Sequence, residues 1–240
     1  MATVNGLRPS AFEDSFRGKW HRFVLFPGLS LPARFRIPQM LHAVRSWQAA
    51  RRLKGRGLHC LLARQTPDAL PQDSADLLFL YDTVLRRRPS RALELGSGES
   101  TLFIAQALYE LGEGHLWSLD ADARWLDHTR AMLPERLSPF VTFVHSPVVV
   151  TEQLGDAAFR YSHIPPGPWD FVFVDGPELT SDVRLSCDLI DLAARLAPGA
   201  FGLIDHRWRT AAIAKELAGD KLRIKYMPTL ESFSVEPRER

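Results

Sequence analysis

Two hydrophobic segments in the second half of the chain end in acidic and imidazole side chains. Asp175 follows one of them in "WDFVFVDGP", and Asp205 and His206 follow the other in "FGLIDHRWR". Carboxylates and an imidazole, whose unperturbed pKa is about 6.5, can remove a proton or bind a divalent cation. We take Asp175, Asp205 and His206 as candidate catalytic residues. Three interpretations of Asp205 and His206 stay open: a base or substrate contact, a metal ligand, or ordinary capping of the next helix.

A turn containing two glycines, "RALELGSGES", carries a second group of candidates. Gly96 permits a sharp turn after a hydrophobic segment, and Gly98 lets a ligand approach the backbone closely. Ser100 and Thr101 open the next helix, whose first N–H groups favour an anionic or acceptor group. Asp120 ends the following hydrophobic segment, 22 residues after Gly98. It is placed to accept hydrogen bonds from both hydroxyls of a ribose, so a nucleoside-containing ligand is indicated.

The elements that must position these residues alternate between strand and helix after Pro89, which predicts an α/β fold with a mainly parallel sheet. The expected strands are 91–95, 115–120, 140–145, 170–175 and 200–205. The expected helices are 99–111, 123–132, 181–196 and 209–218. The ending "LRIKYMPTLESFSVEP" predicts an antiparallel hairpin at the sheet edge. Ligands of parallel sheets bind beyond the carboxyl ends of the strands, where all the candidates above are expected to meet.

Four segments together resemble a known family: "LELGSGEST", "LWSLDAD", "WDFVFVDGP" and "RLAPGAFGLIDH". They are similar to the successive motifs of the class I S-adenosylmethionine-dependent methyltransferases, and most similar to the small-molecule O-methyltransferase-like branch. The resemblance covers about residues 72–240. It implies a Rossmann-like methyltransferase fold with S-adenosylmethionine as the cofactor. The implied cofactor-binding residues are Glu94, Gly96, Ser97, Gly98, Ser100, Thr101, Asp120, Ser146 and Asp175.

The same resemblance implies a role for some of these residues. Glu94 would help to order the glycine turn near the methionine part of the cofactor, and Asp120 would hold the ribose hydroxyls. Ser146, with His145 beside it, would flank the adenine. Catechol-type O-methyltransferases bind a divalent cation with an aspartate after the fourth strand and an Asp-Asn pair after the fifth. Asp175 and Asp205 match that pattern, whereas His206 replaces the asparagine, and magnesium prefers all-oxygen ligands.

The front of the chain differs in charge from the rest. Residues 1–65 contain 12 Lys and Arg against two acidic residues, while the remainder carries a net charge of −8. We expect a basic, mostly helical N-terminal extension (1–70) that acts as a lid or recognition element, followed by the S-adenosylmethionine-binding domain (71–240). A helix is predicted from Pro38 to Gly55 and another over 72–87. Nucleic acid or an anionic membrane surface are alternative partners of the extension.

The expected activity is methyl transfer to an oxygen of a small-molecule acceptor. The alternatives are a nucleic-acid methyltransferase, a non-catalytic binding protein that keeps the cofactor fold, and a nicotinamide-dependent oxidoreductase. Asp175-Gly176-Pro177-Glu178 stands where an Asn/Asp-Pro-Pro-aromatic motif would favour methylation of base amino groups. Thr101 in place of a third glycine argues against a nicotinamide cofactor.

Three smaller expectations complete the interpretation. The proline-rich "FRYSHIPPGPWD", with Tyr161 and His163, is expected to be a structural loop remote from the cofactor, while Trp208 and Arg209 are candidate substrate contacts. The two cysteines have no metal-ligand spacing, and a disulfide is not expected. The chain shows neither a signal sequence nor an apolar stretch of about 18 residues, which predicts a cytoplasmic protein.

Overall fold

The computed structural model of the protein describes residues 44–62, 73–178, 180, 183, 185–227 and 230–238. Most of the expected basic extension, including the predicted helix start at Pro38, lies outside the described residues. None of the described helices is long and apolar enough to cross a membrane.

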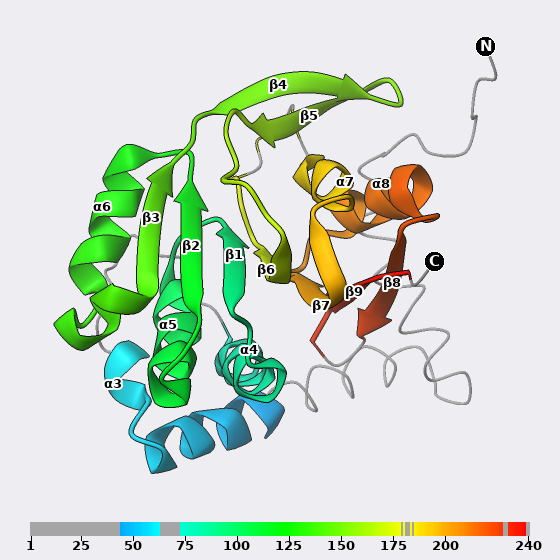
Figure 1. The fold of residues 1–240 in the computed structure, drawn as a ribbon. Helices are drawn as coiled ribbons and strands as arrows, with labels where there is room; N and C mark the ends of the chain where they lie inside the picture. Colours follow the sequence, from blue (N-terminus) through cyan, green and yellow to red (C-terminus); the bar gives the residue numbers. More distant parts are fainter. Residues whose placement is uncertain are drawn as a thin grey trace, which may run out of the picture.

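A seven-stranded sheet forms the centre of the molecule, with the strand order β3-β2-β1-β6-β7-β9-β8 (Figure 1). Its strands are β1 (Arg91–Leu95), β2 (His115–Asp120), β3 (Val141–His145), β6 (Trp169–Val174), β7 (Leu196–Ile204), β8 (Leu222–Met227) and β9 (Ser232–Pro237). The first five are parallel, and β9 runs antiparallel to both β7 and β8. The predicted parallel sheet and antiparallel C-terminal edge hairpin are therefore confirmed. The strand order reverses between β1 and β6, where open α/β sheets bind their ligands.

Helices cover both faces of the sheet. The helices α4 (Ser74–Arg87) and α5 (Glu99–Leu111) belong to one buried cluster, and α7 (Asp188–Leu192) and α8 (Trp208–Ala218) belong to the other. The helix α6 (Ala123–Met132) and the 3-10 helix η1 (Glu135–Phe140) lie between β2 and β3 in the chain and pack near α5. Asp73 caps α4, because its carboxylate accepts a hydrogen bond of 2.7 Å from the backbone N–H of Ala75.

The predicted helix over 181–196 is wrong in extent, since Asp188–Leu192 is the only helical part among the described residues of that range. Residues just before it are held in extended form by β5: the N–H of Phe159 donates to the carbonyl of Leu185, and the N–H of Cys187 donates to the carbonyl of Phe159. This pairing uses backbone groups that a helix would need. The chain after α7 then enters β7 at Leu196, earlier than predicted.

A second, two-stranded sheet was not predicted. The strands β4 (Val148–Gln153) and β5 (Asp156–Tyr161) form an antiparallel hairpin that projects from the main sheet (Figure 1). Leu154 and Gly155 connect them, with φ of 52° and 85°. Two consecutive residues with positive φ are typical of the tightest hairpin turns. Leucine rarely adopts this conformation, so the turn is not predictable from its residue types.

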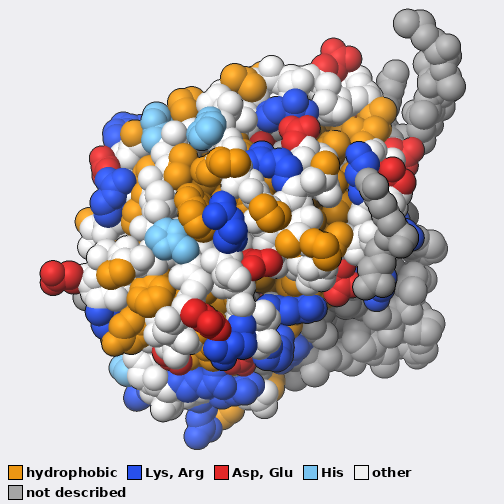
Figure 2. Space-filling view, viewed as in Figure 1, with side chains coloured by type: hydrophobic (Ala, Val, Ile, Leu, Met, Phe, Trp, Pro, Cys, Tyr) orange, Lys and Arg blue, Asp and Glu red, His pale blue; other side chains and the backbone are white. Residues whose placement is uncertain are grey.

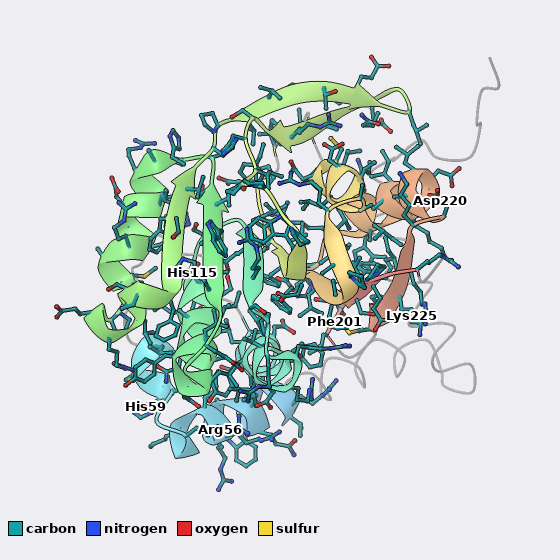
Figure 3. The ribbon with its side chains drawn as sticks, viewed as in Figure 1. Arg56, His59, His115, Phe201, Asp220 and Lys225 are labelled. Atoms are coloured by element: carbon teal, nitrogen blue, oxygen red, sulfur yellow. The ribbon has the colours of Figure 1, made fainter. Side chains whose placement is uncertain are left out.

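Residues 44–55 form a helix that ends at Gly55, as predicted, and α3 (His59–Leu62) follows it. Leu53, Leu58 and Leu61 are buried in the cluster that contains α4 and α5. The Ser46 hydroxyl donates to the carboxylate of Asp73 at 2.6 Å. This basic segment lies on the side of the molecule opposite the β4–β5 hairpin, as the labels of Arg56 and His59 show (Figure 3). A domain boundary near residue 70 stays a prediction.

We predict that Leu53→Ala lowers the free energy of unfolding by about 2–4 kcal/mol, because it removes a fully buried side chain and leaves a cavity. Chemical denaturation measures the change. The matched control is Trp47→Ala on the same helix, where the side chain is 58% exposed and the expected loss is under about 1 kcal/mol. Equal effects of the two substitutions would contradict the packing described here.

Candidate active site

The turns that end β1 and β6 touch each other at the point where the strand order reverses. Gly96 has a φ of 95°, and a Cβ added to it would lie 2.5 Å from the backbone nitrogen of Gly176. A Cβ on Gly176 would likewise lie 2.4 Å from the Cα of Gly96. Both positions therefore require glycine. Around Gly98, in contrast, a Cβ would meet no atom within 4 Å, so the start of α5 is open on that side.

Glu94 lies beneath the glycine turn and is completely buried. Its carboxylate accepts hydrogen bonds from the hydroxyls of Ser100 (2.7 Å), Thr101 (2.6 Å) and Ser118 (2.5 Å). Burial raises the pKa of Glu94 to about 7, although the three hydroxyl donors oppose the shift. The Thr101 hydroxyl also accepts from the N–H of Gly98 at 3.0 Å. Glu94 thus ties β1 to β2 and to the first turn of α5.

Asp120 lies at the end of β2. Its carboxylate accepts a hydrogen bond of 3.0 Å from the N–H of Ser97 and one of 2.9 Å from the N–H of Asp122. Burial raises the pKa of Asp120, and these backbone donors oppose that effect. The Ser97 hydroxyl is hydrogen-bonded to that of Ser118 at 2.7 Å. The glycine turn and the acidic end of β2 are therefore one hydrogen-bonded unit.

Ser146 follows β3 and is fully buried. Its hydroxyl donates a hydrogen bond of 2.6 Å to the carbonyl of His163 and accepts one of 2.9 Å from the N–H of the same residue. Ser146 therefore fastens the segment after β5 to the end of β3. A contact of Ser146 with adenine stays a prediction.

The expectation that Tyr161 belongs to a loop remote from the cofactor is wrong. Tyr161 is the last residue of β5, and its ring is only 3% exposed. A Cβ on Gly176 would lie 2.5 Å from its hydroxyl oxygen. The β4–β5 hairpin carries the chain back to the carboxyl ends of β1 and β6, which explains the difference.

Asp175, at the end of β6, faces a buried arginine. The Arg207 guanidinium donates to the carbonyl of Asp175 and, at 2.8 Å, to the carbonyl of Pro177. It also lies 3.8 Å from the Asp175 carboxylate. Burial lowers the pKa of Arg207, whereas the negative charge of Asp175 acts to raise it. No sequence pattern distinguishes Arg207 from a solvated arginine, yet its side chain joins the loops after β6 and β7.

Asp205 and His206 meet a third side chain, Asp76 of α4. The His206 Nε2 lies 3.4 Å from the carboxylate of Asp76 and 3.5 Å from that of Asp205. The hydrogen bond to Asp76 raises the pKa of His206 to about 9, while burial raises the pKa of Asp205. Possible ligand atoms of these three residues lie within 4.8 Å of one another. Asp175 was expected in this group, but its carboxylate faces Arg207 instead.

A largely apolar cleft opens beside this cluster, between α4 and the strands β6 to β9. Asp76 and Asp205 form part of its wall, and Ser232 donates to Asp205 at 2.9 Å. The remaining lining residues are Phe79, Leu80, Phe173, Leu203, Met227 and Leu230. Trp208, a candidate substrate contact, packs instead against the rings of Tyr226 and Phe233 on the opposite face of the sheet.

Sequence reasoning missed Asp76, Tyr161 and Arg207. Asp76 precedes His206 by 130 residues, and no local motif connects them. Its position on the first turn of α4, at the same end of the molecule as the strand ends, becomes informative only when the packing of α4 is known.

Residues 93–206 match the model of a protein family described as a methyltransferase domain. The matched region contains the glycine turn, Asp120, Asp175 and the end of β7. Together with the strand order, this match supports a protein of the class I S-adenosylmethionine-dependent methyltransferase type. A search of curated proteins finds no match to the chain.

Solved structures with the same fold include a putative O-methyltransferase from Klebsiella pneumoniae. It is 16% identical, covers 83% of this chain and 98% of its own, and has a TM-score of 0.50. An O-methyltransferase from Streptomyces achromogenes, involved in tomaymycin synthesis and solved with S-adenosylmethionine, is also 16% identical. It covers 80% of this chain and 87% of its own, with a TM-score of 0.45.

We predict that Glu94 makes the protein less stable as the pH rises from about 4.5 to about 7. The pKa of Glu94 is raised from 4.5 in the unfolded chain to about 7 in the folded protein. Its contribution is therefore fully present below pH 4.5 and lost as the pH passes 7, by up to about 3 kcal/mol. Glu94→Gln should remove this component in denaturation curves measured across that range.

The control is Glu152→Gln, which changes an exposed carboxylate on β4. It should leave the pH dependence of the wild-type protein in place. The same slope in Glu94→Gln as in the wild type would show that the buried carboxylate is not its origin.

Proposed function

We propose that the protein transfers a methyl group from S-adenosylmethionine to an oxygen atom of a small-molecule acceptor. The observation that carries the proposal is the position of the Asp76–Asp205–His206 cluster beside an apolar cleft. Asp205 and His206 follow β7, which pairs with β6, and β6 in turn pairs with β1, the strand that ends in the glycine turn. A donor site and a proton-handling site at one sheet edge suit transfer to a hydroxyl group.

The residues around the glycine turn fit the cofactor. Asp120 carries a half-buried carboxylate for the ribose hydroxyls, and the open side of Gly98 leaves the first N–H groups of α5 accessible. When bound, S-adenosylmethionine supplies a sulfonium methyl group whose carbon an in-line nucleophile can attack, with the neutral thioether as the leaving group. The chain's part is to align the acceptor and exclude water, which requires no covalent intermediate.

The side chains that line the cleft match the chemistry of an acceptor with an apolar body and a hydroxyl group. Phe79, Phe173 and Leu203 offer apolar surface, while the carboxylates of Asp76 and Asp205 offer hydrogen-bond acceptors at one end. An acceptor hydroxyl that donates to either carboxylate would lie next to His206.

His206 is the group that we assign to proton removal. Since its pKa is about 9, the imidazole is protonated at neutral pH and cannot accept another proton. The active form of the site is then the neutral imidazole: the acceptor hydroxyl loses its proton to His206 as its oxygen takes the methyl group. Asp76 and Asp205 stabilise the imidazolium that results.

A divalent cation is the alternative occupant of the same cluster. Two carboxylates and one imidazole fit a transition-metal ion better than magnesium, which prefers oxygen ligands throughout. Such an ion would acidify an acceptor hydroxyl and would compete with the proton on His206.

A nucleic-acid acceptor is the second candidate function. The side chains of Arg51, Arg52, Lys54 and Arg56 are exposed on the basic N-terminal segment, and Arg51 stacks over the exposed ring of Trp47 at 4.7 Å. Figure 2 shows Lys and Arg side chains gathered along the lower edge of the molecule, where this helix lies. Such a surface suits phosphate contacts and base stacking.

We predict that the wild-type protein binds S-adenosylmethionine and S-adenosylhomocysteine but not NAD in calorimetric titrations. Asp120→Ala should weaken both interactions at least tenfold, because the carboxylate that would hold the ribose is lost. Asp122→Ala is the matched control: it removes a neighbouring exposed carboxylate, which caps α6, and should leave the affinity unchanged. Tight NAD binding without a response to either sulfur nucleoside would refute the proposal.

We further predict that kcat/KM for a hydroxyl acceptor, measured in the presence of a chelator, rises about 50-fold between pH 7 and pH 9, as His206 loses its proton. His206→Ala should abolish the rise, whereas His59→Ala, an exposed histidine on α3, should retain it. An acceptor screen identifies the substrate needed for this measurement.

Two outcomes would change the assignment. Loss of activity with the chelator and recovery with a divalent cation would assign the cluster to metal binding. Unchanged turnover in His206→Ala would refute the role of His206, and turnover on RNA but on no small molecule would favour the second candidate function.

A further inference from the structure

The hydroxyl of Tyr161 has no hydrogen-bond partner among the residues that the structure describes. This is unusual, because buried polar groups are nearly always hydrogen-bonded. Tyr81 shows the ordinary situation: it is equally buried, and its hydroxyl donates to the carboxylate of Glu110 at 2.5 Å.

The unpartnered hydroxyl points to the centre of the candidate active site. Its contact with Gly176 places it where the turns of β1 and β6 meet, since Gly176 also touches Gly96. The charged groups near it are the carboxylates of Asp120, Asp175 and Asp188 and the guanidinium of Arg207.

Those neighbours are engaged elsewhere. Asp188 accepts the backbone N–H of Tyr161 at 2.8 Å and the hydroxyl of Ser186 at 2.7 Å, which fixes the end of β5. Arg207 donates to the backbone of the loop after β6. Burial raises the pKa of Tyr161 well above its ordinary value, so the phenol stays neutral and keeps its proton for donation.

We propose that Tyr161 is a cofactor-binding residue whose hydroxyl donates a hydrogen bond to an oxygen of bound S-adenosylmethionine. This inference rests on the proposed function, and it adds a donor from the β4–β5 hairpin to the residues that the family resemblance implies. The hairpin then has a functional consequence, because it delivers Tyr161 to the junction of the two turns. The carboxylate of Asp120 accepts from the ribose in the same assignment, so that the nucleoside meets one acceptor and one donor.

The test is Tyr161→Phe, which removes only the hydroxyl oxygen. Calorimetric titration with S-adenosylhomocysteine should give a Kd about tenfold higher than that of the wild type, because one hydrogen bond to the ligand is lost. The thermal unfolding midpoint of the ligand-free variant should stay equal to that of the wild type or rise, since no partner within the described protein loses a bond. At saturating ligand, the stabilisation of the variant should be smaller than that of the wild type.

Tyr81→Phe is the matched control with the opposite expectation. It removes a hydroxyl that is bonded to Glu110, at the opposite end of α5 from the glycine turn, so it should lower the unfolding midpoint and leave the Kd unchanged. Opposite effects of the two substitutions would separate a ligand-binding hydroxyl from a structural one.

A Kd of Tyr161→Phe within twofold of the wild-type value would overturn the inference and leave the proposed function intact. A lower unfolding midpoint in ligand-free Tyr161→Phe would also overturn it, since the hydroxyl would then serve the fold. Absence of S-adenosylhomocysteine binding by the wild-type protein would overturn both the inference and the proposed function.

Discussion

The burial of the Glu94 carboxylate is the constraint on which the rest of the site depends. A fully buried carboxylate is costly unless its oxygens are hydrogen-bonded, and three hydroxyls from α5 and β2 meet that requirement. Because Ser100 and Thr101 must turn toward Glu94, α5 begins in one register only. Ser118 must face the same way, which places Asp120 two residues later at the end of β2. The position of the candidate ribose acceptor therefore follows from the need to satisfy one buried acid.

A second constraint joins the donor side of the site to the acceptor side. The turns at Gly96 and Gly176 approach too closely for any side chain, so the end of β6 cannot shift without moving the glycine turn. Arg207 extends this coupling to β7 by donating to the carbonyls of Asp175 and Pro177. Asp205 and His206 are thereby held at a set position relative to the candidate cofactor-binding residues. Methyl transfer requires this kind of alignment more than it requires a reactive side chain.

Much of this architecture could be predicted from the sequence because the signals are local. Each parallel strand carries its own hydrophobic run, and all of them except β3 end at or just before a glycine or an aspartate. The segment of β8 and β9 has turn-forming residues of its own. The β4–β5 hairpin escaped prediction because Leu154 takes a positive φ that leucine rarely adopts. The helix over 181–196 was overestimated because Phe159 pairs with the segment at 185–187, a contact that local sequence does not encode. Asp76 and Tyr161 reach the site only through the packing of α4 and of that hairpin.

The charges of the site favour a cationic ligand. The carboxylates of Asp120 and Asp175 lie at the strand ends with Arg207 as the buried cation nearby, and burial raises the pKa of Asp120. A raised pKa means that the buried environment disfavours the charged form of the carboxylate in the ligand-free site. A positively charged ligand would reduce this unfavourable electrostatic energy. S-Adenosylmethionine carries a sulfonium charge that S-adenosylhomocysteine lacks, so methyl transfer removes the charge that these carboxylates favour. The same electrostatics that attract the donor would then weaken the hold on the product, and the neutral Tyr161 hydroxyl would contribute equally to both.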